Sequence, residues 1–121
     1  MKKSEELLEK FGKQVIEEVR DNQIRYVGAF LDRTSYEGKL YEDDLANLSQ
    51  SQTEMIRQMA ISWVDGTLHD LFYLLEDSDW VTLQLKDADG VAKDIRKIAF
   101  ADLQGYISIW AEKYSKQNKK D

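Results

Sequence analysis

The residues best suited to chemistry lie in the stretch 64-VDGTLHDLFYLLED-77, which holds the single histidine of the chain, His69. Asp65 precedes His69 by four residues, so on a helix the two side chains lie one turn apart and can meet. A carboxylate and an imidazole at this spacing can both bind one metal ion. The sequence offers no cysteine and no second histidine, so any further ligand must be a carboxylate from another element.

A structural role accounts for Asp65 and His69 more simply. Both residues border the apolar face of the predicted helix, where a carboxylate or a backbone carbonyl can hold the imidazole. One histidine and one carboxylate are weak evidence for a complete ligand set. A catalytic relay with Ser62 is ruled out, because all three side chains lie on one helix surface and the histidine cannot stand between the other two. We therefore expect no cofactor. An enzyme that uses Asp65 and His69 is kept as an alternative to a structural role for these two residues.

Composition narrows the class of protein further. A chain of 121 residues is long enough for one domain, residues 1–121, that folds without disulfides or metals. The absence of cysteine removes thiolate nucleophiles, and the scattered glycines form no phosphate-binding loop. The N-terminus lacks the apolar run of a signal peptide and no stretch is long enough to span a bilayer, which predicts a cytoplasmic protein with no membrane partner.

Charge is distributed unevenly along the chain, whose formal net charge is −6. Residues 50–90 carry 2 basic and 8 acidic groups, whereas residues 91–121 carry 7 basic and 4 acidic groups. An acidic protein repels phosphate backbones, which argues against a nucleic-acid partner. The acidic centre of the chain suits a basic protein partner instead.

Hydrophobic periodicity predicts an α+β protein, mostly helical, with the order α-α-β-β-α: two long helices, one β-hairpin and a C-terminal helix. The first helix covers residues 4–33. At 100° per residue its apolar arc contains Leu8, Phe11, Val15, Val19, Tyr26 and Phe30. Gly12 lies near the centre of this arc, which indicates a close crossing with another helix.

The second helix follows a break in this period. Residues 34–49 are predicted to form a loop that can hold one helical turn at 43–48. Two capping boxes can start the helix, Ser49 with Gln52 or Ser51 with Glu54. Its apolar residues cover about half of the circumference, so we expect this helix to be packed on two sides as the central element of the fold.

A period of two follows the second helix and predicts a β-hairpin. The strands cover about 80–86 and 91–98, joined by the turn 87-DADG-90. A three-residue loop at 88–90 places Leu83 opposite Ile95, although the same register sets Val81 against Lys97. The last helix is predicted at 100–117, with a stripe of Leu103, Ile107, Trp110 and Tyr114.

Surface residues suited to a protein partner fall into two segments. Tyrosine is favoured in binding patches because it offers a large contact area at a low cost in conformational entropy. The acidic and tyrosine residues that we expect to contact a partner are Tyr36, Tyr41, Glu42, Asp43, Asp44, Tyr73, Glu76, Asp77 and Asp79. Tyr73 also shares a side of its helix with Met55 and Met59, which marks either an interface or the packing site of a third helix.

The run 65-DGTLHDLFYLLE-76, followed by a strand and later by 110-WAEKYSK-116, resembles a family of small bacterial proteins of unknown function. Its members carry a D-x-T-L-H-x-L-x-x-x-L-E helix, a short hairpin and a closing helix that ends in W-x-x-x-aromatic-S-K. The resemblance covers about the C-terminal 60 residues. It implies a bacterial origin and a cytosolic location, and it supplies no activity.

The sequence therefore favours a small, non-enzymatic binding protein that neutralises or regulates a protein partner, in the manner of an immunity protein or an antitoxin. The expected partner is a basic toxin or enzyme that faces the acidic, tyrosine-containing surface. Two alternatives remain from other classes: the metal- or small-ligand-binding enzyme of Asp65 and His69, and a self-associating structural protein such as a homodimer.

Overall fold

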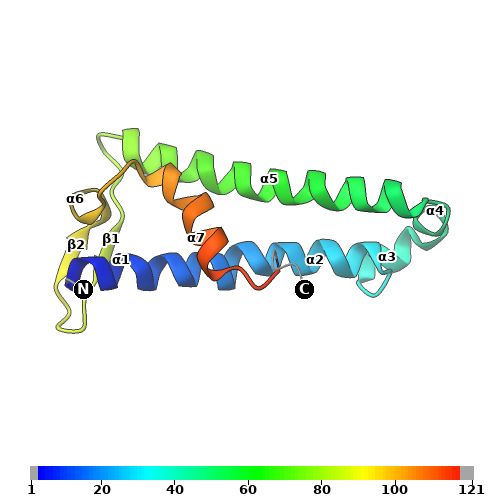
Figure 1. Ribbon diagram of the computed structural model, residues 1–121, viewed down its shortest axis with the longest axis horizontal. Helices are drawn as coiled ribbons and strands as arrows, with labels where there is room; N and C mark the ends of the chain where they lie inside the picture. Colours follow the sequence, from blue (N-terminus) through cyan, green and yellow to red (C-terminus); the bar gives the residue numbers. More distant parts are fainter. Residues whose placement is uncertain (1–2, 118–121) are drawn as a thin grey trace.

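The computed structural model describes residues 3–117, and it confirms a mostly helical α+β protein with one two-stranded antiparallel sheet. Two long helical segments run antiparallel and form the body of the molecule (Figure 1). The elements, in chain order, are α1 (Lys3–Gln14), η1 (Val15–Arg20), α2 (Asp21–Leu31), α3 (Tyr36–Leu40), α4 (Glu42–Ala46), α5 (Gln50–Asp77), β1 (Gln84–Lys86), β2 (Ala92–Asp94), α6 (Ile95–Ile98), η2 (Leu103–Gly105) and α7 (Tyr106–Tyr114).

A π-helical segment, η1, interrupts the first long helix and changes which side of it is buried. Here the backbone N–H of Asp21 donates to the carbonyl of Ile16, five residues earlier. A π turn holds one more residue than an α turn, so the buried face moves on by one position. Ile24, beyond η1, is 4% exposed, whereas Val19 within η1 and Tyr26 beyond it are 47% and 64% exposed. The predicted apolar arc is therefore wrong from Val19 onward, because it assumed an uninterrupted α-helical period.

The segment between the long helices is more ordered than the predicted loop. It forms two short helices, α3 and α4, at one end of the molecule (Figure 1). Ser35 caps α3 by accepting a hydrogen bond from the N–H of Gly38 at 3.0 Å. Gly38 is buried, and a Cβ there would lie 2.6 Å from the carbonyl oxygen of Phe30. Close backbone packing thus fixes α3 against the end of α2.

The start of α5 and the hairpin register are as predicted. Ser49 and Gln52 form the complete capping box of α5. The strands pair Leu85 with Lys93, and the N–H of Ile95 donates to the carbonyl of Leu83 at 3.0 Å, which is the predicted alignment. The second strand is shorter than expected, because Asp94 caps α6 and turns the chain into a helix at Ile95. The pair of Val81 with Lys97 therefore does not form.

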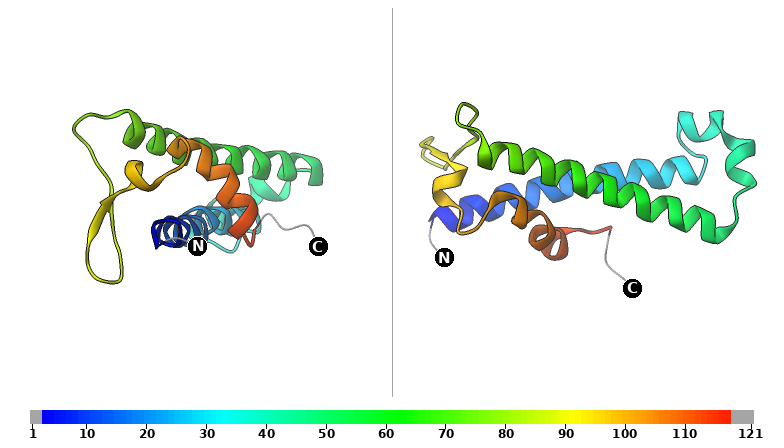
Figure 2. Two further views of the ribbon diagram at one scale, coloured as in Figure 1. Left: turned by 60° about the vertical axis from the view of Figure 1, so that its left-hand side comes forward. Right: turned by 90° about the horizontal axis from the view of Figure 1, so that it is seen from above.

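The core lies where α7 crosses α1 and the second half of α5, and Trp110 is at its centre with 0% exposure. Figure 2 shows α7, α6 and the hairpin gathered around this end of the two long helices. Phe11 and Phe72 both meet the Trp110 ring edge-on, with centroids about 6 Å apart. Gly12 allows this crossing, because a Cβ there would lie 2.4 Å from Cε2 of Trp110.

The prediction that the second long helix, α5, is packed on two sides is wrong. Leu68 and Phe72 are its fully buried residues, and both belong to its second half. Large apolar side chains elsewhere on α5 remain open to solvent, namely Met55, Met59, Trp63, Leu71, Tyr73 and Leu74. No helix within residues 3–117 is both long enough and apolar enough to cross a membrane.

The crossing at Gly12 gives a first testable prediction. Gly12→Ala pushes a methyl group into the Trp110 ring and should lower the free energy of unfolding by about 1–3 kcal/mol. Gly66→Ala is the matched control, because a Cβ at Gly66 meets nothing within 4 Å. That change should raise stability by about 0.5–1 kcal/mol, since alanine favours a helix interior. Urea unfolding measures both, and equal effects would contradict the close crossing.

Candidate functional site

Asp65, the central residue of the predicted metal site, is held by a buried arginine. Arg20 is 1% exposed, and its Nε lies 2.5 Å from Oδ1 of Asp65 while Nη2 lies 3.1 Å from Oδ2. Both carboxylate oxygens therefore accept hydrogen bonds from one guanidinium, the bidentate geometry that gives the strongest charge-assisted pairs. The positive charge of Arg20 beside Asp65 would oppose the binding of a cation there.

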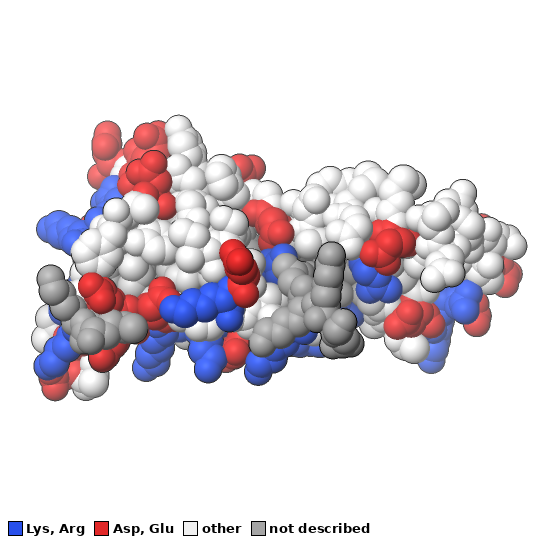
Figure 3. Space-filling view, viewed as in Figure 1, with Lys and Arg blue, Asp and Glu red and all other residues white. Residues whose placement is uncertain are grey.

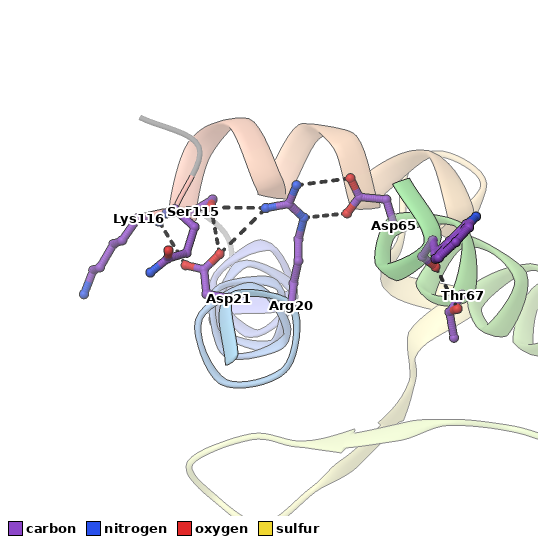
Figure 4. Close-up of polar contacts among 8 residues, drawn as sticks. Arg20, Asp21, Asp65, Thr67, Ser115 and Lys116 are labelled. Atoms are coloured by element: carbon purple, nitrogen blue, oxygen red, sulfur yellow. Dashed lines mark hydrogen bonds and ion pairs between the residues drawn. The ribbon is translucent and has the colours of Figure 1, made fainter. Parts of the chain in front are cut away.

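The same guanidinium reaches the end of α7. Nη1 of Arg20 donates to Oγ of Ser115 at 3.1 Å, and this hydroxyl donates to Oδ1 of Asp21 at 2.7 Å. Oδ2 of Asp21 accepts from the backbone N–H of Lys116 at 2.9 Å. Figure 4 shows these side chains converging from three segments of the chain. Asp21 and Ser115 are each 1% exposed, whereas the Asp65 side chain is 37% exposed, so the network is buried except at α5. It joins the first long helix, α5 and the C-terminal segment.

His69 stands apart from this network. Its imidazole is 54% exposed, and its Nδ1 lies 3.6 Å from a carboxylate oxygen of Asp70 rather than from Asp65. It lines a shallow hollow of about 260 Å³ with Asp65, Gln104 and Ser108. Within residues 3–117, no three His, Cys, Asp or Glu side chains gather closely enough to hold a metal ion. The spacing of Asp65 and His69 thus gives no support to the metal hypothesis.

A second polar cluster surrounds Glu9, where α1 meets α7. Glu9 accepts hydrogen bonds from Nε1 of Trp110 at 2.9 Å, from the hydroxyl of Tyr114 at 2.7 Å and from the ammonium of Lys113. Burial raises the pKa of Glu9, and the hydrogen bonds from these groups more than offset it, so the pKa lies below its ordinary value. Burial, and then the bond to Glu9, raise the pKa of Tyr114.

These shifts make the cluster unsuited to proton transfer at neutral pH. The hydrogen bond to Glu9 raises the pKa of Lys113, so the ammonium stays protonated while Glu9 stays ionised. Asp94 behaves similarly: burial raises its pKa, and hydrogen bonds from the backbone and side chain of Arg96 bring it below the ordinary value. A general acid or base needs a pKa near the working pH, and each of these groups is moved away from it.

The residues expected to contact a partner lie at opposite ends of the molecule. Tyr36, Tyr41, Glu42, Asp43 and Asp44 belong to α3 and α4, ahead of α5. The second set, Tyr73, Glu76, Asp77 and Asp79, lies at the other end of α5 or just beyond it. The 28 residues of α5 span about 42 Å at 1.5 Å per residue, so the two sets cannot form one surface. The prediction that these residues form a single acidic surface is therefore wrong.

The first of these two sets lies on one short segment, which we call the tip (residues 36–44). Tyr36, Leu40 and Tyr41 are 77%, 63% and 51% exposed. The segment carries four carboxylates and one lysine, and none of these groups forms an ion pair with another residue in the described part of the chain. The ring of Phe30 meets that of Tyr41 at 6.5 Å and supports it from α2.

The second set is less uniform. Asp77 and Asp79 are exposed, and acidic side chains gather at this end of α5 in Figure 3. Glu76 differs, because its Oε2 is buried and has no hydrogen-bond partner among the described residues. Tyr73 is 52% exposed, and Met55 and Met59 are exposed as well, so no helix of the described chain covers the tyrosine–methionine patch.

Comparisons of the chain with protein-family models, with curated proteins and with solved structures found no match. The resemblance to small bacterial proteins stays a prediction. Its two segments do meet in space, because Asp65 comes from the first, Ser115 and Lys116 come from the second, and Arg20 and Asp21 join them.

The sequence analysis did not predict the polar network formed by Arg20, Asp21 and Ser115. Arg20 and Asp21 belong to a segment that was predicted to be a regular α-helix, and Arg20 is part of no recognisable motif. One signal was present: Ile24 and Leu31 lie outside the predicted apolar arc, yet both are buried. Two apolar residues out of phase with the first half of a helix indicate an extra residue in one turn.

The buried network yields a second prediction. Arg20→Met leaves Asp21 buried without its guanidinium and should cost about 3–5 kcal/mol of unfolding free energy. His69→Gln changes an exposed side chain outside the network and should stay within about 0.5 kcal/mol of the wild type. Urea unfolding at neutral pH compares the two variants. A large loss for His69→Gln together with a small one for Arg20→Met would contradict this account.

The Glu9 cluster predicts a specific pH dependence. Because the pKa of Glu9 is lowered by folding, its ionised form stabilises the protein above its ordinary pKa of 4.5, and this contribution is lost as the pH falls through the folded pKa. Glu9→Gln should therefore be less stable than the wild type by about 1 kcal/mol at pH 7. The difference should shrink below pH 4.5. Urea unfolding across this range measures it, and a difference independent of pH would refute the role of the charge.

Proposed function

We propose that this protein is a non-enzymatic binding domain that neutralises or regulates a basic protein partner, and that the tip holds this partner. The observation that carries the proposal is the combination, on one short segment, of exposed tyrosines and of carboxylates that form no ion pair among the described residues. Tyr36 and Tyr41 supply apolar contact area, and Glu42, Asp43 and Asp44 supply the charge. Aromatic anchors surrounded by charges that match the partner are the common composition of a protein interface.

The packing beneath the tip supports this role. Ser35 caps α3, the N–H of Thr34 donates to the carbonyl of Ala29 at 2.9 Å, and Gly38 sits directly on the backbone of α2. A surface ordered in the free protein loses little conformational entropy on binding, so more of the contact energy appears as affinity. Negative charge at the tip also speeds the encounter with a basic partner and makes the rate depend on salt.

An immunity-like or antitoxin-like action follows from this chemistry. Enzymes that act on nucleic acids present basic surfaces to their substrates. An acidic tip can occupy such a surface and exclude the substrate without any catalytic group of its own.

The test is an affinity capture from the cells that naturally make the protein, at low and high salt, identified by mass spectrometry. Tyr36→Ala with Tyr41→Ala, or Glu42→Gln with Asp43→Asn and Asp44→Asn, should reduce capture of the partner at least tenfold. Asp77→Asn with Asp79→Asn is the matched control at the opposite end and should leave capture unchanged. High salt should weaken capture by the wild type.

The proposal fails if no stoichiometric partner is captured at low salt. It also fails if the partner is lost from the variant at Asp77 and Asp79 and retained by the tip variants. All variants change exposed side chains, so their helical content by circular dichroism should match that of the wild type.

A further inference from the structure

The β-hairpin lies beside α1, at the end of the molecule opposite the tip (Figure 1). Between them is a hollow of about 240 Å³, lined on α1 by Leu7, Lys10, Phe11 and Gln14 and on the hairpin by the whole of β1, Gln84–Lys86. Successive side chains of a strand point to opposite faces of the sheet. A hollow that touches all three residues of β1 therefore runs along the edge of the strand, and we call it the α1–β1 groove.

The hydrogen bonds on either side of β1 show which backbone groups face this groove. Before the strand, the N–H of Ile95 donates to the carbonyl of Leu83 at 3.0 Å. After it, the N–H of Asp87 donates to the carbonyl of Val91, also at 3.0 Å. In an antiparallel ladder, hydrogen-bonded pairs alternate with pairs that are not hydrogen-bonded. The bonds at these two flanking pairs therefore fix the alternation across the strand between them.

The alternation leaves two residues of β1 with their backbone directed away from β2. Leu85 is opposite Lys93 and belongs to a hydrogen-bonded pair, whereas Gln84 and Lys86 belong to the pairs between. The N–H and C=O groups of Gln84 and Lys86 thus point to the outer side of β1. No other backbone or side chain among the described residues bonds to them. The α1–β1 groove therefore offers two donors and two acceptors of an open strand edge.

The side chains of the α1–β1 groove favour an acidic occupant. Its charged residues are Lys10 and Lys86, both exposed, and neither forms an ion pair within the described part of the chain. Leu7, Phe11 and Leu85 are partly buried and supply an apolar floor. The neighbouring hollow at the hairpin turn holds equal numbers of lysines and carboxylates, so the excess of positive charge lies along β1 itself.

We propose that the α1–β1 groove binds an extended acidic segment of another protein, which pairs with β1 and adds a third strand to the hairpin. In this mode of recognition main-chain hydrogen bonds to the strand edge supply affinity, and side-chain contacts supply selectivity. Side chains of the added strand alternate between the two faces. Those on the face of Leu85 meet the apolar floor, and those on the face of Lys86 meet the positive charge. The segment that fits best alternates acidic with apolar residues.

A second copy of this protein fits the open edge less well than an acidic segment does. Two β1 edges paired about a two-fold axis would bring Lys10 and Lys86 of both copies together. Like charges on neighbouring strands destabilise the pair. An acidic strand in the same place gains from both lysines, so charge distinguishes the two occupants.

This proposal does not depend on partner binding by the tip. The tip precedes α5 in the chain and the hairpin follows it, so the two surfaces lie at opposite ends of the molecule. The tip is acidic and suits a basic partner, whereas the α1–β1 groove suits an acidic segment. Capture of a partner by the tip and binding of a peptide by the groove are measured separately, and either can fail alone.

The test is fluorescence anisotropy of a labelled peptide, Gly-Asp-Val-Asp-Val-Asp-Gly with both ends capped, titrated with the full chain. The wild type should bind it with a Kd below about 1 mM. The same peptide with N-methyl groups on its five central residues keeps every side chain but cannot donate to β1. It should bind at least about tenfold more weakly, because several hydrogen bonds are lost.

Variants of the protein test the two contributions separately. Gln84→Pro removes an N–H that faces the groove, a position where a strand edge tolerates proline, and it should weaken binding about fivefold. Gln84→Ala keeps this N–H and should bind within about twofold of the wild type. Lys10→Gln with Lys86→Gln should weaken binding about fivefold. Arg25→Gln with Lys97→Gln is the matched control, since it makes the same change in net charge outside the groove.

Three outcomes overturn the proposal. The first is a wild type that leaves the peptide unbound at about 1 mM protein. The second is equal binding of the N-methylated peptide, which would reduce the contact to charge alone and which needs no variant to fold. The third is a dimer of the wild type in sedimentation velocity that Gln84→Pro dissociates, because a second copy would then occupy the edge of β1.

Discussion

The buried guanidinium of Arg20 is the constraint on which the arrangement of this protein depends. A charge removed from water destabilises the fold unless partners of opposite charge and good geometry surround it. Here the partners come from separate parts of the chain: Asp65 from α5, Ser115 from the segment after α7, and Asp21 from the next residue. Because hydrogen bonds are directional, these contacts hold α5 and the C-terminal segment in place against the first long helix. They add to the close apolar crossing of Gly12 and Trp110.

The π turn lies next to this network in the chain, because η1 ends at Arg20 and Asp21 follows it. Its extra residue moves the buried face of α2 by one position, which leaves Tyr26 exposed and Ile24 buried. π turns of this kind occur often where a protein has a special structural or functional need.

Two surfaces of different character result. The tip carries carboxylates and tyrosines on a segment whose Gly38 packs against the backbone of α2, while the groove between α2 and α5 is lined by uncharged side chains. The first suits a basic partner that is attracted from a distance, and the second suits a contact driven by the removal of apolar area from water.

The sequence by itself determined the helical class, the element order, the capping box at Ser49, the hairpin register and the close crossing at Gly12. Each of these features depends on short-range periodicity or on the conformational preference of a single residue, so residues close together in the sequence are enough to predict it. It also indicated the open patch of Tyr73, Met55 and Met59, and left two explanations for it.

Tertiary structure alone decided that Asp65 pairs with Arg20 rather than with His69, because that contact joins residues 45 apart. It likewise decided that the acidic sets lie at opposite ends of α5, since distance in space depends on the length of the helix between them. Local patterns carry no information about which distant side chains meet, and that is settled by the packing of whole elements around one buried charge.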